Sequence, residues 1–173
     1  TIKIEANKEH RVDIQLHRWI DMPAKGWYSG DTHIHYARTH ARDDKNILNH
    51  AKAEDLHVSN LLLSGNTESI YYPQYNWGVE ARYGQGSYYL VPGQEDPRTQ
   101  RIGHTMQLNI SEPVRNTDQY YLYHKVFEQV QQQGGLTGYA HVNEGAWVMG
   151  GLALDVPFGL VDLVEILGGG TSR

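Results

Sequence analysis

The residue types best suited to binding a metal ion fall at the ends of apolar segments in this chain. His33 and His35 alternate in GDTHIHY, and Glu95 follows the apolar run of LVPGQE. Two further histidines border apolar runs, His104 in IGHTMQL and His141 in GYAHVNEG. Positions i and i+2 of an extended segment project from one face, so His33 and His35 can share a cation at the usual Zn–N distance of about 2.0–2.1 Å. Taken singly, each residue fits a solvated or structural role at least as well, whereas the combination favours a metal site.

The chemistry expected of such a site is hydrolysis. Because the chain has no cysteine, a transition metal must bind through His, Asp or Glu. One carboxylate with histidines on both sides of it in the sequence suits a bridge between two cations, which together lower the pKa of a bound water towards about 7 and stabilise a hydrolytic transition state. We therefore expect one or two divalent ions, zinc, manganese or iron, and a small-molecule substrate.

The elements that must position these residues alternate between strands and helices. A helix is predicted over residues 42–56 and another over 118–133. Strands are predicted at 2–6, 12–19, 26–36, 58–63, 88–93, 104–110, 136–141 and 160–167. Such an α/β pattern implies a parallel sheet or barrel with its ligands at the carboxyl ends of the strands.

Pro23 and the residues after it interrupt the first two alternating runs, so we place a domain boundary near residue 25. Residues 1–25 are then the tail of a β-rich segment or sandwich, and residues 26–173 form the metal-binding domain. Because the chain starts at Thr1, we expect a processed chain or a piece of a longer one. Such a start is compatible with an exported or periplasmic protein, and the compartment stays open.

Residues 67–87 have no clear period and are predicted to form a long loop rich in tyrosine. Tyr71 and Tyr75, with Tyr72, Trp77 and Tyr83 as further candidates, are expected in the wall of a substrate pocket, while a self-packed loop or an oligomer contact is the alternative. Arg98 and Arg101 lie between Glu95 and His104, where either could bind an anionic group through a bidentate fork or could simply lie on the surface.

Composition argues against two other classes of partner. The chain of 173 residues has 15 Lys and Arg against 20 Asp and Glu, a formal charge of −5, which disfavours nucleic-acid binding by charge. No apolar run approaches the roughly 20 residues that a membrane span needs. The oligomeric state is left open.

The motifs GDTHIHY, VPGQE, the Gly-His pair at 103–104, the Ala-His pair at 140–141 and VDLVEI together resemble, in order and spacing, the PHP (polymerase and histidinol phosphatase) domain. Within it, RWIDMPAKGWYSGDTHIH resembles the carbaryl-hydrolase-like branch of CehA/McbA-type metallohydrolases. The resemblance implies a distorted (β/α)7 barrel that binds two or three divalent metals, and hydrolysis of a phosphoester, ester, amide or carbamate bond.

Carried over residue by residue, the resemblance assigns His33 and His35 to a first metal and His104 and His141 to a second, with Glu95 as the bridge. The metal-bridging Glu95 is also the expected catalytic carboxylate. Two further roles follow from the same comparison: Asp31 orients an imidazole from outside the ligand set, and His40 is a candidate ligand of a third metal. Glu144 and Glu165 are further candidates for an outer acid or base.

The sequence also departs from the family pattern. Ser64, Gly65 and Asn66 stand where many members carry Asp-His-Asn, which leaves Asn66 as a weak substitute ligand, and no late Asp-x-His appears before Arg173. We therefore expect a barrel that is incomplete at its C-terminus, and a last motif further downstream in a longer protein is one alternative. The alternative function is a non-catalytic module that binds a ligand such as a glycan on a degenerate or incomplete barrel.

Overall fold

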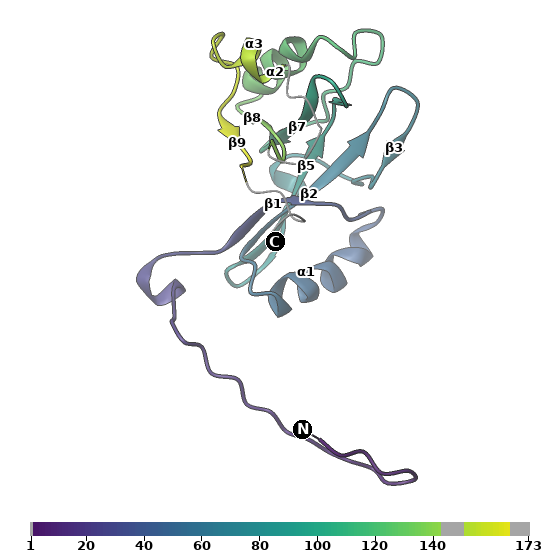
Figure 1. The fold of residues 1–173 in the computed structure, drawn as a ribbon, viewed down its shortest axis with the longest axis vertical. Helices are drawn as coiled ribbons and strands as arrows, with labels where there is room; N and C mark the ends of the chain where they lie inside the picture. Colours follow the sequence, from purple (N-terminus) through teal and green to yellow (C-terminus); the bar gives the residue numbers. More distant parts are fainter. Residues whose placement is uncertain (1, 143–150, 167–173) are drawn as a thin grey trace.

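A computed structural model describes residues 2–142 and 151–166 of the chain (Figure 1). Its centre is a sheet in the order β1-β2-β5-β7-β8-β9, with three short strands paired to inner strands of that order. The main strands are β1 (Gly30–Ile34), β2 (Val58–Gly65), β5 (Tyr88–Glu95), β7 (Gly103–Leu108), β8 (Leu136–Tyr139) and β9 (Leu163–Val164). The short strands are β3 (Ile70–Tyr71), β4 (Tyr83–Gln85) and β6 (Arg98–Thr99), which pair with β2, β5 and β7 respectively.

The sheet is mixed. β1, β2 and β5 run parallel to one another, β5 to β7 and β7 to β8 are antiparallel, and β8 to β9 is parallel again. The described helices are α1 (Asp44–Ala53), α2 (Tyr123–Gln132) and the single turn α3 (Leu152–Asp155), with short 3-10 turns η1 (Pro23–Lys25), η2 (Ala41–Asp43) and η3 (Val79–Ala81). The architecture is a curled, mixed half-barrel of strands.

The prediction of a distorted (β/α)7 barrel is therefore wrong for this chain. Such a barrel needs a helix after nearly every strand, and the described residues hold only two helices longer than one turn. β5 and β7 are joined by residues 96–102, whereas a parallel crossover takes a dozen residues or more. The prediction of a parallel sheet is therefore wrong from β5 to β7, which are antiparallel.

α1 covers one face of the parallel strands. Its apolar stripe of Ile47, Leu48 and Ala51 packs on Leu61 of β2 and Leu90 of β5. Leu62, the next residue of β2, points to the opposite face and packs on Met106 and Ala140, together with Leu108. The middle of β2, Leu61 to Leu63, is apolar without interruption because both of its faces are covered.

α2 covers the antiparallel half of the sheet. Tyr123 and Phe127 pack on Tyr139 of β8, and Val126 and Val130 pack on the segment after β7. Figure 1 shows α1 and α2 at opposite ends of the sheet, so the two helices do not form one covering layer.

The sequence VPGQE in β5 fits its place in the sheet. β5 pairs with β4 as far as Leu90 and with β7 from Gln94, so Pro92, which has no N–H to donate, falls in the gap between the two partners. A Cβ on Gly93 would lie 2.7 Å from Cδ2 of Leu62 and 3.0 Å from the carbonyl oxygen of Gln107. The close approach of three strands therefore requires glycine there, two residues before Glu95.

The two strands predicted in the N-terminal segment are absent from described residues 2–29, so that prediction is wrong. The segment runs as an extended, exposed arm away from the sheet (Figure 1), and Trp19 is fully exposed. The guanidinium of Arg18 donates to both carboxylate oxygens of Asp55, just after α1, and so attaches the arm to the folded part of the chain. These contacts and a hydrogen bond from the hydroxyl of Tyr88 lower the pKa of Asp55 to about 2. The domain boundary near residue 25 stays a prediction.

Residues 67–87 are not the structureless loop that the sequence predicts. They contain β3, η3 and β4, of which β3 extends the edge of β2 and β4 extends the edge of β5. In the part of the chain that the structure describes, no helix has the length and apolar character needed to cross a membrane.

Candidate metal centre

The four histidines and the glutamate predicted as ligands lie together at one rim of the sheet. His33 is in β1, His35 follows it, and Glu95 ends β5. Because β7 runs antiparallel to both β5 and β8, His104 at its start lies beside the end of β5 and beside His141, which follows β8. We call these five residues the His–Glu cluster.

Glu95 is fully buried at the centre of the cluster, and each of its carboxylate oxygens faces one pair of imidazoles. Oε1 lies 3.0 Å from Nδ1 of His104 and 3.5 Å from Nε2 of His141. Oε2 lies 3.1 Å from Nε2 of His35 and 3.6 Å from Nε2 of His33. Within the pairs, the facing ring nitrogens are 3.2 Å apart for His104 and His141 and 3.1 Å apart for His33 and His35.

These distances fit two metal positions. Two ligand atoms at about 2.0–2.1 Å from one tetrahedral ion are roughly 3.3 Å apart. Each carboxylate oxygen of Glu95 forms a triangle with the facing ring nitrogens of its two histidines, and the sides of both triangles measure between 3.0 and 3.6 Å. Oε1 of Glu95 is also buried without a hydrogen bond of normal geometry. The cluster can therefore hold a metal ion, through His33, His35 and Glu95 or through Glu95, His104 and His141.

The electrostatics keep Glu95 in the form that binds a cation. Burial acts to raise the pKa of its carboxyl, but the close contacts with the four imidazoles outweigh burial and hold that pKa far below its usual range. Burial likewise acts to lower the pKa of His33, and the carboxylates of Glu95 and Glu165 more than offset it, so that this pKa is raised. An ionised carboxylate is the form a metal ligand requires.

Glu165, directly after β9, holds two of the cluster histidines in place. Its Oε2 lies 3.1 Å from Nδ1 of His33 and accepts the backbone N–H of His141 at 2.8 Å. A carboxylate on Nδ1 fixes the ring and leaves Nε2 of His33 directed at Glu95. The contact with His141 supports a backbone held at φ 35°, which side chains other than glycine rarely adopt.

Replacing Glu165 by alanine should weaken metal binding about 10–100-fold, because His33 would lose the group that orients its ring. A zinc titration against a chelating indicator measures this. Glu112→Ala, which changes an exposed carboxylate elsewhere, is the control and should leave the affinity unchanged. Equal affinities for Glu165→Ala and the unmodified protein would show that Glu165 does not orient a ligand.

Two further side chains contact the carboxylate of Glu95. Ser64, the parallel partner of Glu95 in β2, donates its hydroxyl to Oε2 at 3.0 Å. Nε of Arg98 lies 3.0 Å from the same oxygen, and Arg98 sits opposite His104 in the β6–β7 ladder. No local pattern marks Ser64 for this role, because only the register of β2 on β5 places it there.

Asp31 does not lie with the cluster. The β1–β2 register shifts between Asp31 and Ile34. Simple alternation would place Asp31 and His33 on the same face of β1, whereas this irregularity places them on different faces. Oδ1 of Asp31 accepts the backbone N–H of His33 at 2.8 Å, whereas Glu165 bonds the imidazole of His33. The orienting carboxylate thus comes from the last strand and not from the first.

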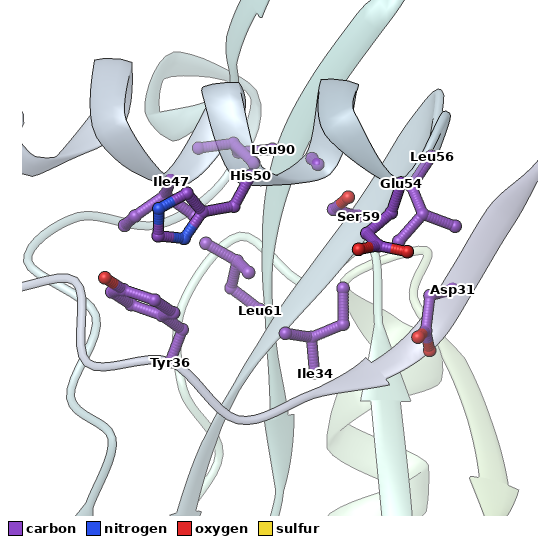
Figure 2. Close-up of a pocket in the computed structure, with 11 residues that line it drawn as sticks. Asp31, Ile34, Tyr36, Ile47, His50, Glu54, Leu56, Ser59, Leu61 and Leu90 are labelled. Carbon is purple, nitrogen blue, oxygen red and sulfur yellow. The ribbon is translucent and has the colours of Figure 1, made fainter. Parts of the chain in front are cut away.

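Asp31 instead borders an apolar cavity of about 260 Å³ between α1 and the first strands (Figure 2). Ile34 and Leu61 line this cavity near the centre of the view, with Tyr36 and His50 to one side of them. None of the cluster residues lines it, so this cavity is separate from the metal centre.

The structure brings neither His40 nor Asn66 into the cluster. His40 is exposed at the start of η2, where its backbone N–H donates to Asp43 and its ring contacts the hydroxyl of Thr39. The amide of Asn66 donates to Tyr71 and accepts from the backbone of Ser69. Both side chains serve local turns.

The tyrosines are arranged differently from the sequence expectation. Tyr71 bonds Asn66 through its hydroxyl, and Tyr75 donates to Asp44 and stacks on Arg38 in a buried network. The ring that covers the metal centre is Tyr72, stacked on His35 with centroids 4.9 Å apart. Its place next to β3 follows from the pairing of β3 with β2, which periodicity does not reveal.

Arg101 lines a cavity next to the cluster and Arg98 lies between that cavity and Glu95. Glu144, a sequence candidate for an outer acid or base, lies outside the described residues. Comparison of the chain with protein-family models, curated proteins and solved structures found no match. The site itself is therefore the basis for the function of this protein.

Proposed function

We propose that this protein is a metal-dependent hydrolase whose centre is the His–Glu cluster. The observation that carries the proposal is the buried carboxylate of Glu95, which offers one oxygen to each of two histidine pairs at distances suited to a shared ion. Imidazole and carboxylate donors suit zinc, manganese or iron, and we expect two ions, with one as the minimum.

Three protein ligands at each position leave coordination sites open for water and substrate, as in catalytic and unlike structural zinc sites. Divalent cations held there would lower the pKa of a water molecule and polarise the bond to be cleaved. The protein's own groups have supporting roles. Glu165 orients His33, Ser64 and Arg98 hold Oε2 of Glu95, and burial of Glu95 excludes competing water.

The same five residues carry the resemblance to PHP metallohydrolases, so we propose that relationship for the site and not for a barrel. The reaction class is cleavage of a phosphoester, ester, amide or carbamate bond in a small molecule. The alternative of a glycan-binding module has little support from Tyr71 and Tyr75, because both bond to neighbouring residues, and within the described part of the chain Tyr72 is the tyrosine that covers the site.

Metal content is the direct test. Protein purified without a metal-affinity step should carry one or two equivalents of zinc, manganese or iron per chain by elemental mass spectrometry. Hydrolysis of model esters and phosphoesters should disappear with a chelator and return when the metal is restored. No metal after incubation with excess divalent ions would reject the proposal, and ligand binding that survives chelation would favour the binding module.

A further inference from the structure

A polar cavity of about 350 Å³ lies directly beside the His–Glu cluster. The β6–β7 turn contributes Arg98 and Arg101, and the facing segments contribute Thr67 and Tyr120. None of the described residues that line it is a carboxylate, whereas the apolar cavity under α1 is bordered by Asp31 and Glu54. The cavity is therefore positively charged.

One acidic group at the border of this cavity, bonded to its lining residue Tyr120, is already paired. Asp96, next to Glu95, is buried, receives the hydroxyl of Tyr120, and lies 2.8 Å from Nε of Arg115. Among the described residues, Arg101 forms no ion pair, and Glu95 is the one carboxylate that forms an ion pair with Arg98. One carboxylate at Arg98 cannot offset the charge of both arginines, and Arg101 is left without a counter-ion among the described residues.

The turn that carries Arg101 is held firmly. Thr99 pairs with Gly103 across the turn, its Oγ1 accepts the backbone N–H of Ile102 at 3.2 Å, and the same oxygen lies 2.8 Å from the hydroxyl of buried Tyr123. A short, bonded turn reduces the ordering cost of binding a ligand there. It also fixes the position of Arg101 relative to the metal centre, because β7 continues directly to His104.

We propose that this cavity is a subsite for a second, non-reacting oxyanion of the substrate, a carboxylate or a phosphate, bound by Arg101 together with Arg98. Guanidinium groups bind such planar or tetrahedral oxyanions through two N–H donors. Cations at the adjacent His–Glu cluster would add to the positive potential and further favour an anionic substrate. The inference extends the proposed function, since it names a substrate class for the same site.

The first test uses protein from which metal has been removed, so that anions cannot bind to metal ions. Isothermal titration with inorganic phosphate and, separately, with succinate should detect binding of at least one of them, and the stronger of the two identifies the kind of oxyanion. Arg101→Ala should weaken binding about tenfold or more, the loss of one charge-assisted contact. Arg42→Ala, at an exposed arginine in η2, is the matched control and should change nothing. No binding of either anion, or equal binding by Arg101→Ala, would overturn the subsite.

The second test separates the subsite from the hydrolase proposal. With metal restored, hydrolysis of 4-nitrophenyl benzoate is compared with hydrolysis of its 4-carboxy analogue. We expect a lower KM for the carboxylated ester, and Arg101→Ala should remove that advantage while leaving the neutral ester unaffected. Hydrolysis without any preference for the anionic ester contradicts the subsite and leaves the hydrolase proposal intact. Anion binding in the titration with no hydrolysis of either ester supports the subsite and counts against the hydrolase.

Discussion

Glu95→Gln is expected to abolish hydrolysis and to reduce bound metal from two equivalents to one or none. The amide offers a single oxygen, and its NH₂ group would direct hydrogens at the second pair of imidazoles, so the two triangles can no longer share one bridge. The loss of affinity should exceed the roughly 10–100-fold that removal of an outer hydrogen-bond partner costs. Elemental analysis of the purified variant and a zinc titration measure both effects.

Two comparisons make that result specific. Ser64→Ala removes only a hydroxyl contact to Glu95 and should retain two equivalents of metal with modestly lower affinity. A thermal melt of metal-free Glu95→Gln shows whether the variant still folds. Retention of both metals at unchanged affinity by a folded Glu95→Gln protein would remove Glu95 from the centre and, with it, the proposed two-ion site.

The second large effect concerns stability. Arg38 is fully buried and forks onto Asp44 at the start of α1, with Nε and Nη2 2.6 and 2.9 Å from the two carboxylate oxygens. Asp44→Ala would leave the guanidinium buried without its counter-ion, which costs about 3–5 kcal/mol. For a chain of this size, we expect the Tm to fall by roughly 10 °C or more.

Two further variants test whether loss of the Arg38–Asp44 ion pair causes the fall in Tm. Tyr75→Phe keeps the ring over Arg38 and removes only the hydroxyl, which donates to Asp44 and accepts from Nη2 of Arg38, so it should cost about 1–2 kcal/mol. Asp118→Ala alters an exposed aspartate and should leave the melting curve unchanged. If Asp44→Ala and Asp118→Ala melted together, the buried pair would contribute nothing to stability.

Several elements could be predicted from the sequence because their patterns are local. The period of Ile47, Leu48 and Ala51 predicts a helix, and the structure has α1 there. The apolar run around Leu61 predicts a strand covered on both faces, which β2 is. Strand direction was not predictable in this way, since an apolar run is the same whether its neighbour is parallel or antiparallel.

The N-terminal arm shows where a local pattern fails to predict the structure. Its alternation of apolar and polar residues is typical of a strand, yet no partner strand lies beside it among the described residues, and it stays extended and exposed. A strand needs the hydrogen bonds of a neighbour as well as its own pattern. Local sequence therefore overstates strand content wherever the pairing partner is missing.

By itself, the sequence determined the donors of the candidate metal centre. His33, His35, Glu95, His104 and His141 have the required chemistry, and their places at strand ends follow from short-range patterns. Only the tertiary structure decided that Glu95 gives one oxygen to each histidine pair, that Glu165 and not Asp31 orients His33, and that Tyr72 covers the site. The physical reason is that these contacts depend on strand direction, register and the irregularity in β1, which are set by pairing between residues far apart in the chain.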